Sequence, residues 1–432
     1  EVGKTVKRHA PKRLESLYMT SERKSLFASS ERFPGRWVLT ASFVLLTFSS
    51  GVGFYGLSVY LQAFSRELGW SVASISSATT FFFLVGGLAA IPIAKLVAKY
   101  DVRWVVVAGA FLGSGSLLCM RFVSERWHLF AVYAVYALGW SASGVGPVTT
   151  VVTRWFEAKR ASALAIASTG LSVGGIVVTP FIKWILDTRG IEAGSPWLAT
   201  IWFVGIVPIA VLCLLPFPHH LGWLPDGERA ATTAAPVMSG TPLAVAVKSR
   251  FFLMVAIGYI FAFGAQVGGV QQLVKMVEER TDRTTATLGT VVLSLFSIIA
   301  RFTASRLIAR LDMTRFTVMI AVMQGVSLAL IGFMNSSIGL LVGIALFGAT
   351  IGNMLMMQSL LIAQKFGVLD YPRIAARQGL ISFTGTAGGP LLLGALHDFA
   401  GGYRSSYLVA GVCSLFGALL FSLAGSANDR PS

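Results

Sequence analysis

The chain has 432 residues, of which 55% are hydrophobic and 12% are charged, and its mean hydropathy is +0.72. Soluble domains carry about 25% charged residues, so this composition excludes an ordinary soluble domain. The net charge of +16 is dispersed along the chain rather than clustered on one face, which argues against a nucleic-acid-binding protein.

The chain begins with a polar, basic segment, 1–35, which lacks the apolar core of a signal peptide and is expected to be a disordered cytoplasmic tail. Twelve apolar stretches follow, and each is long enough to cross a bilayer, which takes about 20 residues. In chain order we place these spans at 37–64, 73–93, 104–123, 129–152, 161–185, 197–215, 251–274, 286–305, 316–334, 338–363, 379–396 and 407–424. The sequence therefore predicts an all-α membrane protein with twelve transmembrane helices.

The distribution of positive charge indicates how these spans are oriented. If the N-terminus is cytoplasmic, most of the 35 lysines and arginines fall on the cytoplasmic side, and few, among them Arg66 and Lys183, fall in outer loops. Such an asymmetry is the positive-inside rule. We therefore expect both termini in the cytoplasm and the protein in the plasma (inner) membrane.

The sequence repeats itself after six spans. The segment LVAKYD (96–101) follows the second span and LIARLD (307–312) follows the eighth, while an arginine followed by paired glycines recurs at the fifth and eleventh spans. Two six-helix bundles joined by a linker form the major facilitator fold. We expect bundles at 36–215 and 251–424, a cytoplasmic linker at 216–250 and a C-terminal tail at 425–432.

The two repeated loops each carry an aspartate and a cation, Asp101 with Arg103 and Asp312 with Arg310. We expect these charges to pair with helix ends in one conformation and to release them in another, which makes them candidate gating residues. The alternative is a solvated turn that only marks the orientation of the chain.

One charge, Arg301, lies well inside a span. A cation in hydrocarbon costs at least about 2.5–3.5 kcal/mol, so such a residue usually faces a wet cavity and has a partner there. Thr290, Ser294 and Ser297 share a helical face with Arg301. Because arginine binds a carboxylate through two parallel hydrogen bonds, this polar stripe predicts an anion site. The alternative is that Arg301 snorkels to the inner interface or forms a structural pair.

Five other side chains are candidate substrate contacts: Tyr55 and Ser58 in the first span, Trp140 in the fourth, Gln266 in the seventh and Asn353 in the tenth. A buried amide in lipid needs a partner, so Gln266 and Asn353 are expected to face protein or a cavity. For each of the five, the alternative is packing within the protein.

Carboxylates are missing from the deep parts of the spans, where none of the 19 Asp and Glu residues falls. The anion therefore either carries its own proton into the site or exchanges for another anion, and the sequence leaves both schemes open. One deep cation matches one carboxylate, which favours monoanions over dianions.

Three groups of motifs resemble the monocarboxylate-porter-like branch of the major facilitator superfamily. They are RWF (154–156) with RASALA (160–165), LGWLPDG (221–227), and GGPLLLG (388–394) with HD (397–398) and GGYR (401–404). The resemblance implies alternating-access transport of small organic anions, mostly monocarboxylates, with Arg301 at the position that holds the carboxylate. Vertebrate members carry an aspartate where Ser297 stands and a lysine in the first helix, where 57–59 has none, so their scheme of proton coupling is not expected here.

Other functions find less support in the sequence. It has no intramembrane set of residues for hydrolysis and no nucleotide-binding loop, so we expect neither an enzyme nor an ATP-driven pump. Cys119, Cys213 and Cys413 lie in separate spans without metal-ligand spacing, and no metal or other cofactor is expected. The expected partners are a small organic anion, the lipid bilayer and either protons or a counter-anion. The alternative function is an exporter of other small amphipathic solutes or drugs.

Overall fold

A computed structural model describes residues 33–157, 159–215, 217–218, 223–227, 240–308, 312–367 and 370–427. Within these ranges the chain is almost entirely helical, and its only bridge pairing joins Gly240 and Gly367. The helices of the first half are α2 (Gly35–Phe48), η2 (Ser49–Phe54), α3 (Gly56–Leu68), α4 (Val72–Lys99), α5 (Val102–Cys119), η3 (Met120–Phe122), α6 (Arg126–Ser143), α7 (Val145–Trp155), α8 (Arg160–Val173), η4 (Gly174–Val178) and α9 (Thr179–Cys213). Those that follow are η6 (Pro225–Gly227), α10 (Leu243–Ala246), α11 (Arg250–Arg280), α12 (Arg283–Ile308), α13 (Met313–Phe333), α14 (Ser337–Phe366), α15 (Tyr371–Phe399) and α16 (Tyr403–Ala424).

Eleven helical runs among the described residues are long and apolar enough to cross a membrane. One of them, Ser162–Cys213, has 52 residues. At 1.5 Å per residue such a helix would measure about 78 Å, more than twice the roughly 30 Å of a bilayer core. It is broken at Gly190, where φ is 71° and ψ is −177°, so it supplies two crossings. The expectation of twelve spans is confirmed within the described ranges.

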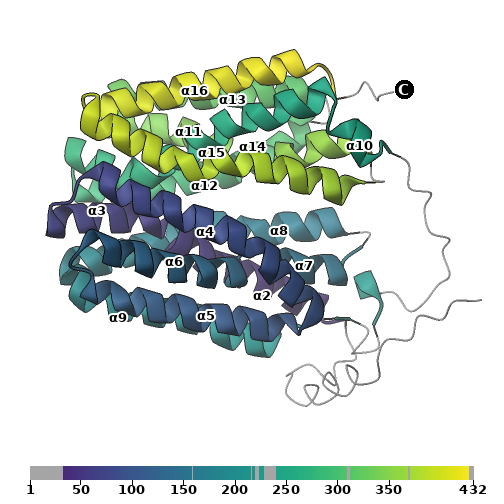
Figure 1. Ribbon diagram of the computed structural model, residues 1–432, viewed down its shortest axis with the longest axis horizontal. Coiled ribbons are helices and arrows are strands. Elements are labelled where there is room, and N and C mark those ends of the chain that lie inside the picture. The colour runs from purple at the N-terminus through teal and green to yellow at the C-terminus, as the bar shows by residue number, and fades with distance from the viewer. Residues whose placement is uncertain are drawn as a thin grey trace, which may run out of the picture.

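The helices form two groups in space (Figure 1). Helices α2 to α9 lie together, and helices α11 to α16 lie beside them. The groups meet mainly where α4 packs on α15 and where α3 packs on α11. This arrangement confirms the expected fold class, two bundles of six helices, while the residue boundaries given for the domains stay predictions. Most of 1–35, much of 216–250 and the end of 425–432 lie outside the described residues.

The bundles have two distinct ends. The end that carries α10 and the start of α5 at Asp101 is called the linker end below, and it lies at the right of Figure 1. The opposite end, which carries Gly190 and the end of α11 at Arg280, is called the far end.

Glycines let α15 approach α11 closely. A Cβ at Gly385 would overlap the backbone carbonyl of Ile260, and one at Gly389 would overlap that of Gly264. Gly388, which lies between them in the sequence, has open space at the same position. This glycine cluster therefore divides into two positions in contact with α11 and one with open space.

These glycines predict a contrast in stability. Gly385→Ala is expected to lower the melting temperature of the detergent-solubilised protein by several degrees, because an added methyl in a packed contact costs about 1–3 kcal/mol. Gly388→Ala, the matched control, adds the same methyl in open space inside the helix and should not lower the melting temperature. Equal melting temperatures for both variants would contradict the packing of α15 on α11.

Candidate functional site

Arg301 lies on α12 at the contact between the two bundles. Its Nη1 donates a hydrogen bond of 3.3 Å to the backbone carbonyl of Ser168 on α8, so the guanidinium points at the opposite bundle. Gly352 on α14 faces it from its own bundle, and a Cβ there would stand 2.5 Å from Nη2 and 2.7 Å from Nε. The guanidinium therefore lies between the backbone carbonyl of Ser168 and the backbone of Gly352, which has no side chain.

Within the described ranges, no Asp or Glu forms an ion pair with Arg301. An arginine has five N–H donors, and the Ser168 carbonyl occupies one of them. The described residues give no hydrogen-bond acceptor to the remaining donors.

The serines of the same face of α12 continue the contact with the first bundle. Ser297 is fully buried and accepts a hydrogen bond of 3.4 Å from Ser172 on α8. Ser294 is also fully buried, and its hydroxyl has no hydrogen-bond partner within the described chain. A Cβ at Gly175 would overlap Ser294 and stand 3.1 Å from the ring of Tyr55. Tyr55, Ser294, Ser297 and Arg301 thus lie along one seam between the bundles.

Two buried side-chain amides have an oxygen with no hydrogen-bond partner among the described residues. Asn353 follows Gly352 on α14, its Nδ2 donates to the carbonyl of Ala349 at 3.0 Å, and its Oδ1 has no partner among described residues. Gln266 on α11 is buried, and its Oε1 likewise lacks a described partner. Both were expected to face protein or a cavity, and their burial agrees with that expectation. Contact with a substrate stays a prediction for both residues.

The structure uses Ser58 and Trp140 in other contacts. The hydroxyl of Ser58 accepts the backbone N–H of Val274 on α11 at 3.1 Å, which joins the two bundles. The indole of Trp140 donates to the carbonyl of Ser49 at 3.1 Å and borders a cavity of about 310 Å³ together with Phe383 of α15. Contact with a substrate stays a prediction for both side chains.

Two π-helical segments, η2 and η4, lie beside the seam and were not anticipated. They pack on each other, and Thr179 donates to the carbonyl of Gly51 at 3.1 Å and to that of Gly174 at 3.2 Å. Single π-helical turns inside α-helices are frequent at functional sites. The clustered glycines at 51–53 and 174–175 were the available signal for them.

The candidate gating aspartates cap helices. Asp101 accepts the backbone N–H of Arg103 at 2.9 Å at the start of α5 and forms an ion pair of 2.7 Å with the same arginine. Asp312 accepts the N–H of Arg315 at 3.1 Å at the start of α13 and also a hydrogen bond of 2.8 Å from Ser426. Arg310 lies outside the described residues. The repeated motif thus supplies a helix cap in both halves, and its role in gating stays a prediction.

One charged group was assigned to the wrong environment. Lys183 was placed in an outer loop, but it lies inside α9 with only 1% of its side chain exposed. Its Nζ pairs with Asp187 on the same helix and with Glu278 on α11 of the other bundle. The spacing of Lys183 and Asp187, four residues apart, was a signal for the first pair, and no sequence pattern pointed to the second.

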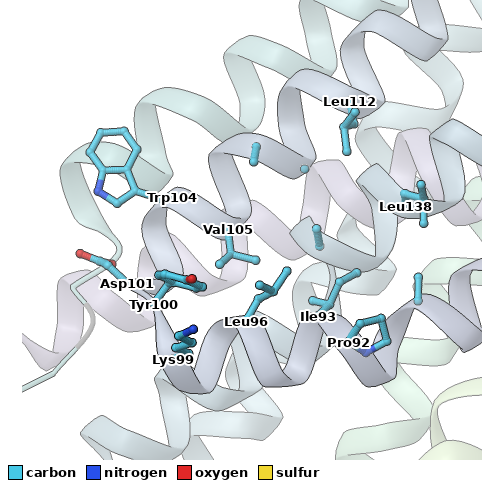
Figure 2. Close-up of a pocket in the computed structure, with 14 residues that line it drawn as sticks. Pro92, Ile93, Leu96, Lys99, Tyr100, Asp101, Trp104, Val105, Leu112 and Leu138 are labelled. Carbon is cyan, nitrogen blue, oxygen red and sulfur yellow. The ribbon is translucent and has the colours of Figure 1, made fainter. Parts of the chain in front are cut away.

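A separate groove of about 670 Å³ runs along the side of the first bundle between α4, α5 and α6. Figure 2 shows Lys99, Tyr100 and Trp104 at one end of it and Leu112 and Leu138 at the other. Tryptophan, tyrosine and lysine are typical of the membrane interface, so this groove is part of the surface that faces the bilayer. None of its lining residues belongs to the seam at Arg301.

Comparison with known proteins points to one family of membrane transporters. The sequence model of the Major Facilitator Superfamily matches residues 43–368. Monocarboxylate transporter 13 of Rattus norvegicus is 24% identical over 384 residues, which cover 86% of this chain and 82% of that protein. MFS-type transporter 1 of an Ophiocordyceps species is 22% identical over 386 residues, covering 88% of this chain and 80% of that protein.

The fold also resembles solved transporter structures. A bacterial homologue of the human lysosomal transporter Spinster, in an inward-facing and unoccupied conformation, superposes with a TM-score of 0.67 at 15% identity over 92% of this chain and 98% of its own. A mutant of the nucleoside transporter NupG gives 0.65 at 13% identity over 90% of this chain and 99% of its own. At these identities the likeness establishes the fold. The relatives and neighbours are transporters rather than enzymes, as the sequence predicted.

The hydrogen bond from Trp140 to Ser49 of η2 is expected to contribute to the free energy of unfolding. Trp140→Phe keeps an aromatic ring but removes the hydrogen bond to the Ser49 carbonyl, which should destabilise the protein by about 0.5–1.5 kcal/mol. Thermal unfolding in detergent measures this change. Trp104→Phe is the control, because Trp104 is exposed in the groove between α4, α5 and α6, and this variant should unfold like the wild type.

Proposed function

The chain belongs to the Major Facilitator Superfamily, and we propose that within it the protein is a secondary transporter of small organic anions, foremost monocarboxylates, with the carboxylate held by Arg301. The observation that carries this proposal is a guanidinium at the contact of the two bundles with no ion-pair partner among the described residues. Two relatives named monocarboxylate transporters, 13 from rat and 11 from human, support the substrate class.

A carboxylate solves the electrostatic problem that Arg301 presents. A lone cation within the membrane is costly, and a substrate carboxylate neutralises it through paired hydrogen bonds. The single cation on this seam matches a single carboxylate, so monoanions are favoured over dianions. Ser294 and Tyr55 are the neighbouring hydroxyl groups that would orient the rest of the substrate.

The position of Arg301 couples binding to movement. Its hydrogen bond to Ser168 joins α12 to the opposite bundle, so an anion that takes over this donor changes a contact between the two bundles. In transporters of this kind one bundle rocks against the other around a central site, which is alternating access. Hydrogen bonds from Gln62 to Glu278 and from Ala73 to Asp398 join the bundles at the far end, so we assign the described conformation to a state closed there.

We propose further that the linker end is cytoplasmic, which puts both termini in the cytoplasm of a plasma-membrane protein. The excess of lysine and arginine at that end supports this orientation. Proton co-transport with the anion and exchange for a counter-anion both fit a site without a deep carboxylate.

Uptake into proteoliposomes tests the assignment of Arg301. With radiolabelled lactate, pyruvate and an aromatic monocarboxylate, Arg301→Gln is expected to lower uptake about a hundredfold, because removing one partner of a buried charge pair costs about 3 kcal/mol or more. Arg126→Gln removes an exposed cation at the far end and is the control. Undiminished uptake by a folded Arg301→Gln protein would refute the assignment.

Gly352 gives a second test that leaves every charge in place. A Cβ in Gly352→Ala would displace the guanidinium of Arg301 and crowd Ser297, so the apparent KM for the anion should rise several-fold while the protein stays folded. Gly388→Ala adds the same methyl in open space and should leave KM unchanged. An unaltered KM in Gly352→Ala would show that the guanidinium position is unimportant for binding.

A further inference from the structure

A cluster of charges joins the two bundles at the far end. Lys183 of α9 contacts Asp187 at 2.5 Å and Glu278 of α11 at 2.8 Å. Gln62 of α3 donates to the other oxygen of Glu278 at 2.8 Å. Side-chain exposure is 1% for Lys183 and 15% for Glu278. Both oxygens of one carboxylate from the second bundle therefore bind donors from the first.

This cluster is suited to hold the far end closed. Buried charges are stable only while they are paired, so Lys183 and Glu278 favour the conformation in which the bundles touch. Separation of the bundles at this end breaks both contacts that Glu278 makes with the first bundle and exposes the carboxylate to water. Asp187 keeps Lys183 and Arg66 within the first bundle, so the lysine would retain a partner after opening.

Other charged groups pack around Glu278. On α12, Arg283 approaches it at 3.5 Å with a side chain that is 58% exposed. On its own helix, Lys275 pairs with Glu279 and Arg280 donates to carbonyls at the end of α13. On α15, His397 pairs with Asp398, which accepts the N–H of Ala73 from the first bundle. His397 is therefore a second titratable group at this contact and needs its own control.

We propose that Glu278 is a proton-binding site that controls the opening of the far end. The ionised carboxylate ties Lys183 and Gln62 to α11 and keeps the end closed. A protonated carboxyl has no charge to offer Lys183, so proton binding favours the open state. The proton enters from the far compartment and returns to it when the end closes again, so it regulates the gate and is not cargo. This regulation rests on the proposed alternating access, but its test needs no substrate.

The test is a distance measurement across the far end. Spin labels at Glu192→Cys on α9 and Asn335→Cys before α14, both at exposed positions, report separation of the bundles by double electron–electron resonance. The three native cysteines are replaced by alanine, and thermal unfolding confirms that this background is folded. Measurements between about pH 4 and pH 8 span the ordinary pKa of a free glutamate, about 4.3, and that of a free histidine, about 6.5.

In the otherwise unaltered chain, acidification is expected to increase the long-distance population. Glu278→Gln should show a ratio of open to closed protein about tenfold higher at neutral pH, with little further change on acidification. Glu279→Gln removes the neighbouring carboxylate, whose ion pair among the described residues is with Lys275 of the same helix, and should behave like the unaltered chain. His397→Asn should keep the acid response.

Two results would overturn the proposal. One is a Glu278→Gln distribution that matches that of Glu279→Gln at every pH. The other is an acid response that survives in Glu278→Gln and disappears in His397→Asn, because it assigns the titration to His397. If Glu278→Gln does not fold, Lys183→Gln removes the same ion pair from the first bundle and must give the same open shift. Failure of anion uptake leaves all these distances interpretable, so the two proposals fail independently.

Discussion

A cation with no described ion-pair partner, held between two bundles, is the constraint on which the rest of the site depends. Arg301 is in the membrane-spanning part of α12, and its one described hydrogen bond goes to a backbone carbonyl of the opposite bundle. The guanidinium lies where any residue other than glycine at position 352 would place its Cβ, and its hydrogen bond to Ser168 is one of the contacts that join the two bundles.

The two contacts between the bundles differ in what they recognise. At the contact around Arg301, several N–H donors have no hydrogen-bond acceptor among the described residues, which suits an anion. The carboxylate at Glu278 is already paired with Lys183 and Gln62, and we infer that this contact responds to a proton. A transporter with this arrangement would bind its substrate at one depth and regulate its gate at another.

Much of the fold could be predicted because it follows from local chemistry. Apolar length gives the spans, and the repeated Asp101 and Asp312 motifs proved to be helix caps in both halves. Arg301 could be found because a charge inside an apolar stretch is rare. The second partner of Lys183, Glu278, could not be predicted from the sequence. It lies far away in the sequence and near the end of its helix, where a glutamate looks like an ordinary surface residue. The π-helical turns and the role of Gly352 depend on which backbones approach each other, and a single sequence does not encode that directly.

The most direct test of the account is binding of a panel of small carboxylates, each paired with its uncharged amide, to the purified protein and to Arg301→Gln. The account predicts that at least one monocarboxylate binds about tenfold or more tightly than its amide, and that this preference disappears in Arg301→Gln. No dicarboxylate should bind more tightly than the best monocarboxylate. A carboxylate preference that persists without Arg301, or amides that bind as well as acids to the unaltered protein, would contradict it.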